Sequence, residues 1–141
     1  MTVTLDDRAR RYIAAFEDVT DATAIDCVVD DDHDRVVFVV TTGEMGQAIG
    51  QDGGRIELLR ERLGRDVELV EDAPTPEGFV ANALTPAAVY NVTISENRDI
   101  VAYVEVDHDD RGVAIGKGGK NIQMAKTLAK RHYDVDDIQL T

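Results

Sequence analysis

The sequence of 141 residues is poor in cysteine, in serine and in long apolar runs. Its single cysteine, Cys27, excludes an internal disulfide and a zinc site built from cysteines, and a reducing, cytoplasmic location is expected. The longest apolar stretches, 36–40 and 100–104, are far shorter than the roughly 18 residues that a membrane span needs. Residues 1–7 lack the basic start and apolar run of a signal peptide, so we expect neither secretion nor a membrane partner.

Residues that could carry catalysis or bind a metal are also scarce. Ser95 is the only serine, and no Ser/His/Asp or Cys/His arrangement is apparent, so we expect no enzyme and no cofactor. Two acidic turns contain histidine, 30–34 and 107–110, but neither has the glycine-punctuated spacing of an EF-hand loop. The sequence therefore favours solvated turns over metal sites at both places.

Positive charge is scarce as well, and it is unevenly distributed. The 28 Asp and Glu outnumber the 15 Lys and Arg and give a net charge of −13. All four lysines fall between Lys117 and Lys130. Residues 111–133 contain six Lys or Arg and no acid, which gives this segment a net charge of +6. The rest of the chain therefore has a net charge of −13 − 6 = −19. The 19 Asp and the excess of Arg (11) over Lys (4) are typical of a halophilic protein surface whose self-repulsion is screened by salt.

An internal duplication organises the chain. Residues 48–56 and 114–122 align without gaps at an offset of 66, and the apolar run 36–40 falls opposite 102–106 at the same offset. Two prolines and a glycine between the copies interrupt any regular element. The expected domains are 1–73 and 74–141, with the linker near 73–77.

Each copy has the pattern of helix, strand, strand, short helix, glycine loop, helix and strand, which predicts an α+β fold. Thr4 and Asp7 have the spacing of a capping box, which predicts the start of the first helix. Gly64 is expected to end the helix after the first glycine loop. The expected strands are 24–29, 35–41, 66–70, 89–95, 100–106 and 137–141, and the second copy is expected to begin with a helix at 77–84.

Each copy contains a glycine loop between two helices, 50–53 in the first and 116–119 in the second. One isoleucine precedes each loop and another lies three residues after it, so Ile-Gly-x-x-Gly-x-x-Ile occurs twice. The motif and the order of elements resemble the KH domain in its prokaryotic, type II topology. The resemblance implies an α-β-β-α-α-β fold with a three-stranded sheet packed against helices. It also implies that N–H groups of the loop and the next helix face a nucleic-acid backbone, while the isoleucines line a groove for unstacked bases.

Two such domains in a chain of this length resemble the archaeal NusA-like transcription termination and antitermination factors. The resemblance covers nearly the whole chain and includes the segment Ala-Leu-x-Pro-Ala at 83–87. It implies an RNA-binding protein, with single-stranded RNA and RNA polymerase as partners, and we expect a monomer without cofactor or metal. The candidate RNA-binding residues are Ile49, Gly50, Gln51, Asp52, Gly53, Arg55, Ile56, Ile115, Gly116, Lys117, Gly118, Gly119, Lys120 and Ile122.

The two loops differ in charge. Asp52 places a carboxylate where a phosphate would bind, whereas the second loop contains Lys117 and is followed by Lys120. We therefore expect the second copy to dominate contact with the RNA backbone. In the first copy, Arg55 is the best candidate for a phosphate contact, and this copy is expected to contribute base stacking or rigidity.

Two other functions fit the same residues. One is a KH protein of ribosome assembly or RNA processing, because a KH loop reads only a few nucleotides. The other is a protein-interaction module whose acidic face docks a basic partner such as RNA polymerase, with RNA secondary. Co-purification with polymerase or with pre-ribosomes, before and after nuclease treatment, distinguishes the three.

Overall fold

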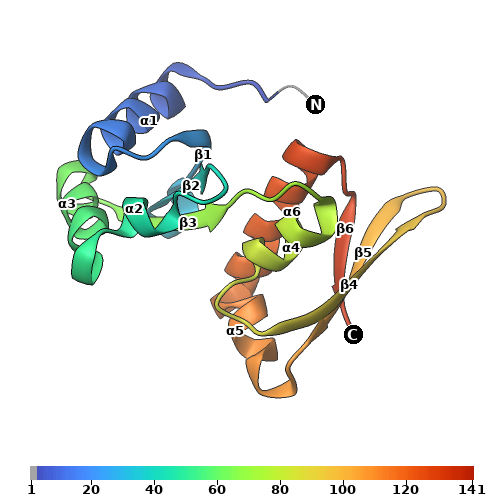
Figure 1. The fold of residues 1–141 in the computed structure, drawn as a ribbon. Helices are drawn as coiled ribbons and strands as arrows, with labels where there is room; N and C mark the ends of the chain where they lie inside the picture. The colour runs from blue at the N-terminus through green and yellow to red at the C-terminus, as the bar shows by residue number, and fades with distance from the viewer. Residues whose placement is uncertain (1–2) are drawn as a thin grey trace. The chain divides into compact units, whose positions relative to one another are not determined.

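The computed structural model describes residues 3–141 and divides into two compact units, Thr4–Asp72 and Ala73–Thr141 (Figure 1). The division falls one residue before the boundary expected from the linker. Both units repeat the order helix, strand, strand, short helix, helix, strand, so the expected α+β fold is confirmed. Among the described residues, no helix is long and apolar enough to cross a membrane.

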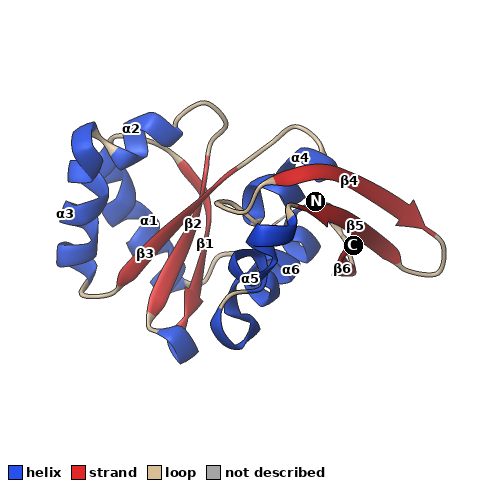
Figure 2. Ribbon diagram, turned by 90° about the horizontal axis from the view of Figure 1, so that it is seen from below, coloured by secondary structure: helices blue, strands red, loops and turns tan. Residues whose placement is uncertain are grey.

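The first unit consists of α1 (Asp7–Thr20), β1 (Ala24–Asp30), β2 (Arg35–Val40), α2 (Met45–Ile49), α3 (Gly54–Leu63) and β3 (Asp66–Glu71). Its sheet has the order β1-β2-β3, with β1 antiparallel and β3 parallel to the central strand. A parallel pair needs a long crossover connection, and the segment from α2 to α3 provides it. Figure 2 shows the three helices of this unit together on one side of its sheet.

The second unit repeats this topology with α4 (Pro76–Ala83), β4 (Val89–Glu96), β5 (Ile100–Val106), α5 (Arg111–Ile115), α6 (Lys120–Tyr133) and β6 (Asp137–Leu140). Its sheet has the order β4-β5-β6, again antiparallel and then parallel. The expected strands agree with the observed ones to within one residue at each end. Gly64 ends α3 in the left-handed conformation, as expected from a glycine at this position.

Each unit buries its apolar residues between its sheet and its helices. In the first unit, Phe16 of α1 stacks on Phe38 of β2 with ring centroids 4.8 Å apart, and Leu59 of α3 belongs to the same buried cluster. In the second unit the buried cluster combines Leu84 and Ile138 with smaller side chains such as Ala102 of β5 and Ala129 of α6. These cores hold α3 and α6 on their sheets and so fix the point at which each glycine loop enters its helix.

The start of the first helix differs from the expectation. α1 begins at Asp7, and the Asp6 side chain accepts a hydrogen bond from the Ala9 N–H (2.8 Å), so Asp6 is the N-cap. The capping box expected from Thr4 and Asp7 is wrong. Asp6 lies immediately before the helix and supplies the acceptor that the first turn needs.

Replacing Asp6 with alanine is expected to lower the free energy of unfolding by about 1 kcal/mol, because the Ala9 N–H loses its acceptor. Thr4→Ala is the control: Thr4 is exposed and lies outside the helix, so the change should stay below about 0.5 kcal/mol. Equilibrium denaturation in molar KCl measures both variants. Equal losses would contradict the assignment of Asp6 as the cap.

Candidate nucleic-acid interface

The two glycine loops follow the same backbone path. α2 and α5 each end one residue before a glycine, which adopts φ 78° and ψ 173° at Gly50 and φ 77° and ψ 167° at Gly116. This combination is essentially restricted to glycine. The last loop glycine then donates its N–H to the first one's carbonyl, from Gly53 to Gly50 (3.2 Å) and from Gly119 to Gly116 (3.0 Å). The loops are therefore compact, closed turns.

Close packing also requires glycine at the first loop position. A Cβ on Gly50 would lie 2.7 Å from Cγ of Arg55, and a Cβ on Gly116 would lie 2.7 Å from Cγ of Asn121. Carbon atoms do not approach so closely in folded proteins. In both copies the loop therefore lies directly on the side chain of the residue five positions later.

The third loop position distinguishes the two copies. Asp52 (φ 54°) and Gly118 (φ 65°) both have left-handed backbone, which aspartate tolerates better than most residues with a side chain. Asp52 is exposed, so its carboxylate is accessible at the first loop. The second loop has no side chain at the equivalent position.

Lys117 and Lys120 are the lysines nearest the second loop. Lys117 is exposed, and within residues 3–141 its ammonium group has no ion-pair partner. Lys120 is half-buried and is the first residue of α6. The positive charge available at this loop therefore comes chiefly from Lys117.

The two lysines further along α6 are paired with carboxylates that follow the helix. Lys126 Nζ lies 3.2 Å from Asp137 Oδ1, while Lys130 Nζ lies 2.8 Å from Asp134 and 2.7 Å from Asp136. Hydrogen bonds to Asp134 and Asp136 raise the pKa of Lys130 above its ordinary value. Residues 111–133 carry a charge of +6, but Asp134, Asp136 and Asp137 follow directly and pair with two of these lysines. The positive charge accessible to an RNA ligand is therefore smaller than +6.

The first loop has little available positive charge. Arg55 Nη1 donates to the carbonyl oxygens of Thr20 (2.8 Å) and Gln47 (3.1 Å), so a phosphate at Arg55 would have to compete with both. The other arginines that follow the loop are paired with carboxylates. They are Arg60 with Glu57 and Asp66, Arg62 with Asp18, and Arg65 with Asp31 and Asp34.

The four isoleucines that flank the loops are of two kinds. Ile49 and Ile115, which precede the loops, are 38% and 39% exposed. Ile56 and Ile122 are half-buried and pack against the cores of their units. The apolar surface beside each loop therefore comes mainly from the isoleucine that precedes it.

Each loop leads into a helix that has no side-chain cap. Gly53 and Gly119 are the N-caps of α3 and α6, and neither offers a side-chain acceptor to the first turn. N–H groups at such a helix start carry a partial positive charge and attract anions. In the second unit the Lys120 N–H donates to the Lys117 carbonyl oxygen, and Lys117 precedes this helix start by three residues, so both the lysine and the helix start favour an anion.

The acidic turns make hydrogen bonds within the fold. Asp30 Oδ2 lies 2.9 Å from His33 Nδ1 and accepts from Arg35 Nε (2.7 Å), and Asp107 accepts from the Tyr90 hydroxyl. Burial alone would raise the pKa of Asp30, but the hydrogen bonds from Arg35 and His33 lower it below its ordinary value. In the part of the chain that the structure describes, no group of three His, Cys, Asp or Glu could hold a metal ion.

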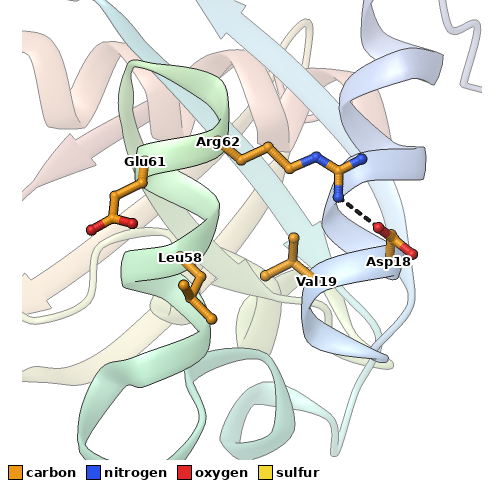
Figure 3. A pocket seen from close by; sticks show the side chains of 5 residues that line it. All are labelled: Asp18, Val19, Leu58, Glu61 and Arg62. Atoms are coloured by element: carbon orange, nitrogen blue, oxygen red, sulfur yellow. Dashed lines mark hydrogen bonds and ion pairs between the residues drawn. The ribbon is translucent and has the colours of Figure 1, made fainter.

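A groove of about 480 Å³ lies between α1 and α3 (Figure 3). Val19 and Leu58 give it apolar walls, Glu61 lies at its side, and Asp18 and Arg62 form an ion pair of 2.6 Å across it. No residue of the first glycine loop lines this groove, so it is separate from the candidate interface.

Sequence reasoning missed Asn121. Its Nδ2 donates to the carbonyl oxygen of Val113 (3.0 Å), and Gly116 rests on it. The sequence feature that could have identified Asn121 is its alignment with Arg55 at the offset of 66. A polar residue in the first turn of a helix is so common that the alignment alone did not single it out.

Comparisons with known proteins agree with this geometry. Residues 10–75 match the family model of the KH domain, and residues 76–141 match that of the NusA-like second KH domain. Neither description is that of an enzyme. The fold and the two glycine loops therefore define a protein with tandem KH domains.

The relatives carry the NusA name. "Probable transcription termination protein NusA" of Halobacterium salinarum is 67% identical over 141 residues and covers 100% of both chains. The protein of the same name from Halococcus morrhuae is 61% identical over 140 residues, with 99% of each chain covered. The crystal structure of APE1850 has a TM-score of 0.85 at 35% identity, over 97% of this chain and 100% of that one. This chain belongs to the NusA-like family of KH-domain proteins.

Gly116→Ala is expected to destabilise the second unit by about 1–3 kcal/mol, since alanine would be strained at this φ and ψ and its Cβ would collide with Asn121. Gly112→Ala is the control, because nothing lies within 4 Å of a Cβ at this helical position. It should be neutral or stabilising by up to about 1 kcal/mol. Thermal or denaturant unfolding measures both. A Gly116→Ala protein as stable as the wild type would mean that the loop is not constrained as described.

Proposed function

We propose that the protein binds single-stranded RNA through its glycine loops and acts in transcription termination or antitermination. The observation that carries the proposal is the second loop, where Lys117, the uncapped start of α6 and the exposed side chain of Ile115 lie close together in the chain. A phosphate is attracted by the partial positive charge at the start of α6 and can pair with Lys117, while a base can pack on Ile115. The Lys120 N–H itself already donates to the Lys117 carbonyl oxygen. The names of the relatives suggest the process.

The two units have unequal roles in this proposal. The second loop holds the RNA backbone, with Gly118 and Gly119 allowing close approach and Lys120 adding charge. The first loop carries Asp52, so it contributes base packing on Ile49 more than phosphate contact. Gly50, Gln51, Gly53 and Gly116 are proposed to contact RNA as parts of the loops, whereas Ile56 and Ile122 pack mainly against the cores of their units.

RNA polymerase is the proposed protein partner, and a monomer in the cytoplasm is the proposed state. Each unit has its own core and its own loop, so a second copy of the chain is not needed to complete a site. The net charge of −13 suits a basic partner surface. Polymerase that stays bound after nuclease treatment would support direct contact, and complete release would mean that RNA bridges the two. Co-purification with pre-ribosomes instead would favour ribosome assembly.

Lys117→Asp is expected to weaken RNA binding by about tenfold or more, because it removes a charge-assisted contact and places a carboxylate beside the phosphate. Gln51→Asp places a carboxylate at the equivalent position of the first loop, which already contains Asp52. It changes the charge by one unit where Lys117→Asp changes it by two, and its effect should be smaller by more than this difference in charge. Fluorescence anisotropy with a short single-stranded oligonucleotide measures both. Equal losses would contradict the dominance of the second loop.

A second pair of variants separates local from overall charge. Lys117→Gln and Lys130→Gln each remove one positive charge, but Lys130 is already held by Asp134 and Asp136. Only Lys117→Gln should weaken binding severalfold. If Lys130→Gln weakens it as much, the overall charge of the unit governs affinity.

Salt is expected to affect binding only weakly. On single strands, the logarithm of the binding constant falls with a slope of about 0.7 for each phosphate that the protein neutralises. Two lysines beside the loop therefore predict a slope of about 1.4. At low salt the acidic body repels RNA, which lowers affinity there and makes the observed slope shallower still. We expect a shallow or non-monotonic dependence on KCl, with binding retained in the molar range. A steep monotonic loss that corresponds to five or six phosphates would show that the whole cationic segment binds.

A further inference from the structure

The side chain beneath each glycine loop makes the same contact in both units. Asn121 Nδ2 donates to the carbonyl oxygen of Val113 (3.0 Å), and Arg55 Nη1 donates to that of Gln47 (3.1 Å). Val113 and Gln47 are equivalent at the offset of 66, as are Asn121 and Arg55. Two chemically different side chains thus donate to equivalent carbonyl groups in the two units. This repetition indicates that the loop requires a donor at this carbonyl group.

The carbonyl group that they satisfy has a structural reason to need a donor. α5 has only five residues and ends at Ile115, where the chain turns away at Gly116. The last carbonyl groups of a helix have no partner within it, and the Val113 oxygen is among them. The Asn121 side chain comes from the first turn of α6, so its hydrogen bond joins the two helices on either side of the loop.

The same side chain also supports the loop by contact. An added Cβ at Gly116 would lie 2.7 Å from both Cγ and Nδ2 of Asn121, so no space separates the glycine from the amide. Asn121 therefore links the helix before the loop to the helix after it and packs against the first glycine of the loop. In the first unit Arg55 does the same, and it reaches further to bind the carbonyl oxygen of Thr20 at the end of α1 (2.8 Å).

We infer that Asn121 and Arg55 are positioning residues that hold the glycine loops in the shape that receives the RNA backbone. This inference rests on the proposed function of the loops. It assigns Arg55 an indirect role, in place of the phosphate contact expected from the sequence. Arg55 also ties the first loop to the end of α1 through the carbonyl oxygen of Thr20.

Asn121→Leu tests the inference, because leucine keeps the branched shape beneath Gly116 but cannot donate to Val113. Gln123→Leu is the matched control, since it makes the same kind of change at an exposed site on α6. The first readout is the free protein: the amide resonances and hydrogen exchange of residues 116–119. The second is affinity for a short single-stranded RNA oligonucleotide, measured by anisotropy.

We expect Asn121→Leu to shift the loop resonances, speed their exchange and weaken RNA binding about fivefold, the usual effect of losing one hydrogen bond. Gln123→Leu should change neither. Asn121→Arg, which places the residue of the first unit in the second, should restore the loop resonances. If Asn121→Leu unfolds the domain, Asn121→Ser, which is too short to reach Val113, provides the same readouts.

Each other outcome is decisive. Unchanged loop resonances in Asn121→Leu would overturn the inference whether or not RNA binds. Disturbed resonances with unchanged RNA affinity would also overturn it, because the held shape would not matter for binding. A wild-type protein that does not bind the oligonucleotide would instead defeat the proposed function, and the resonances would still show whether Asn121 holds the loop.

Discussion

Each glycine loop makes a tight turn between two helices within four residues, with its first glycine packed against the side chain of the residue five positions later. The positive φ of Gly50 and Gly116 and the absence of a Cβ make this turn possible. The cores place α3 and α6 on their sheets, so the loop must meet the start of a helix at a fixed point. The exposed isoleucine, the uncapped helix start and the loop side chains are brought together by this one turn.

In the proposed function, charge distinguishes the two similar loops. Most arginines of the first unit are paired with carboxylates, and two lysines of α6 are paired with aspartates that follow it. What distinguishes the second loop is therefore local: Lys117 is exposed, and Gly118 replaces Asp52. The proposed binding of RNA is compatible with an acidic protein, because N–H groups and apolar contacts are screened by salt far less than ion pairs between exposed groups.

The sequence predicted the elements, the duplication and the positions of the loops, because these depend on local periodicity and on residues that stand next to one another. It predicted the helix start wrongly, since Thr4 and Asp6 are both good acceptors and only the fold shows which one meets the Ala9 N–H. The pairing of Lys126 with Asp137 and the contact of Asn121 with Val113 join residues in different elements. Neither could be deduced from spacing, because both depend on how the helix packs.

Mapping of the amide resonances during titration with a short single-stranded RNA shows which loop dominates RNA binding. We expect the largest changes within residues 115–122 and smaller changes at 49–56. Changes of equal size at both loops would contradict the dominance of the second unit. Changes confined to surfaces away from both loops, such as the exposed Tyr90 and Tyr103 of β4 and β5, would contradict the glycine-loop mechanism altogether.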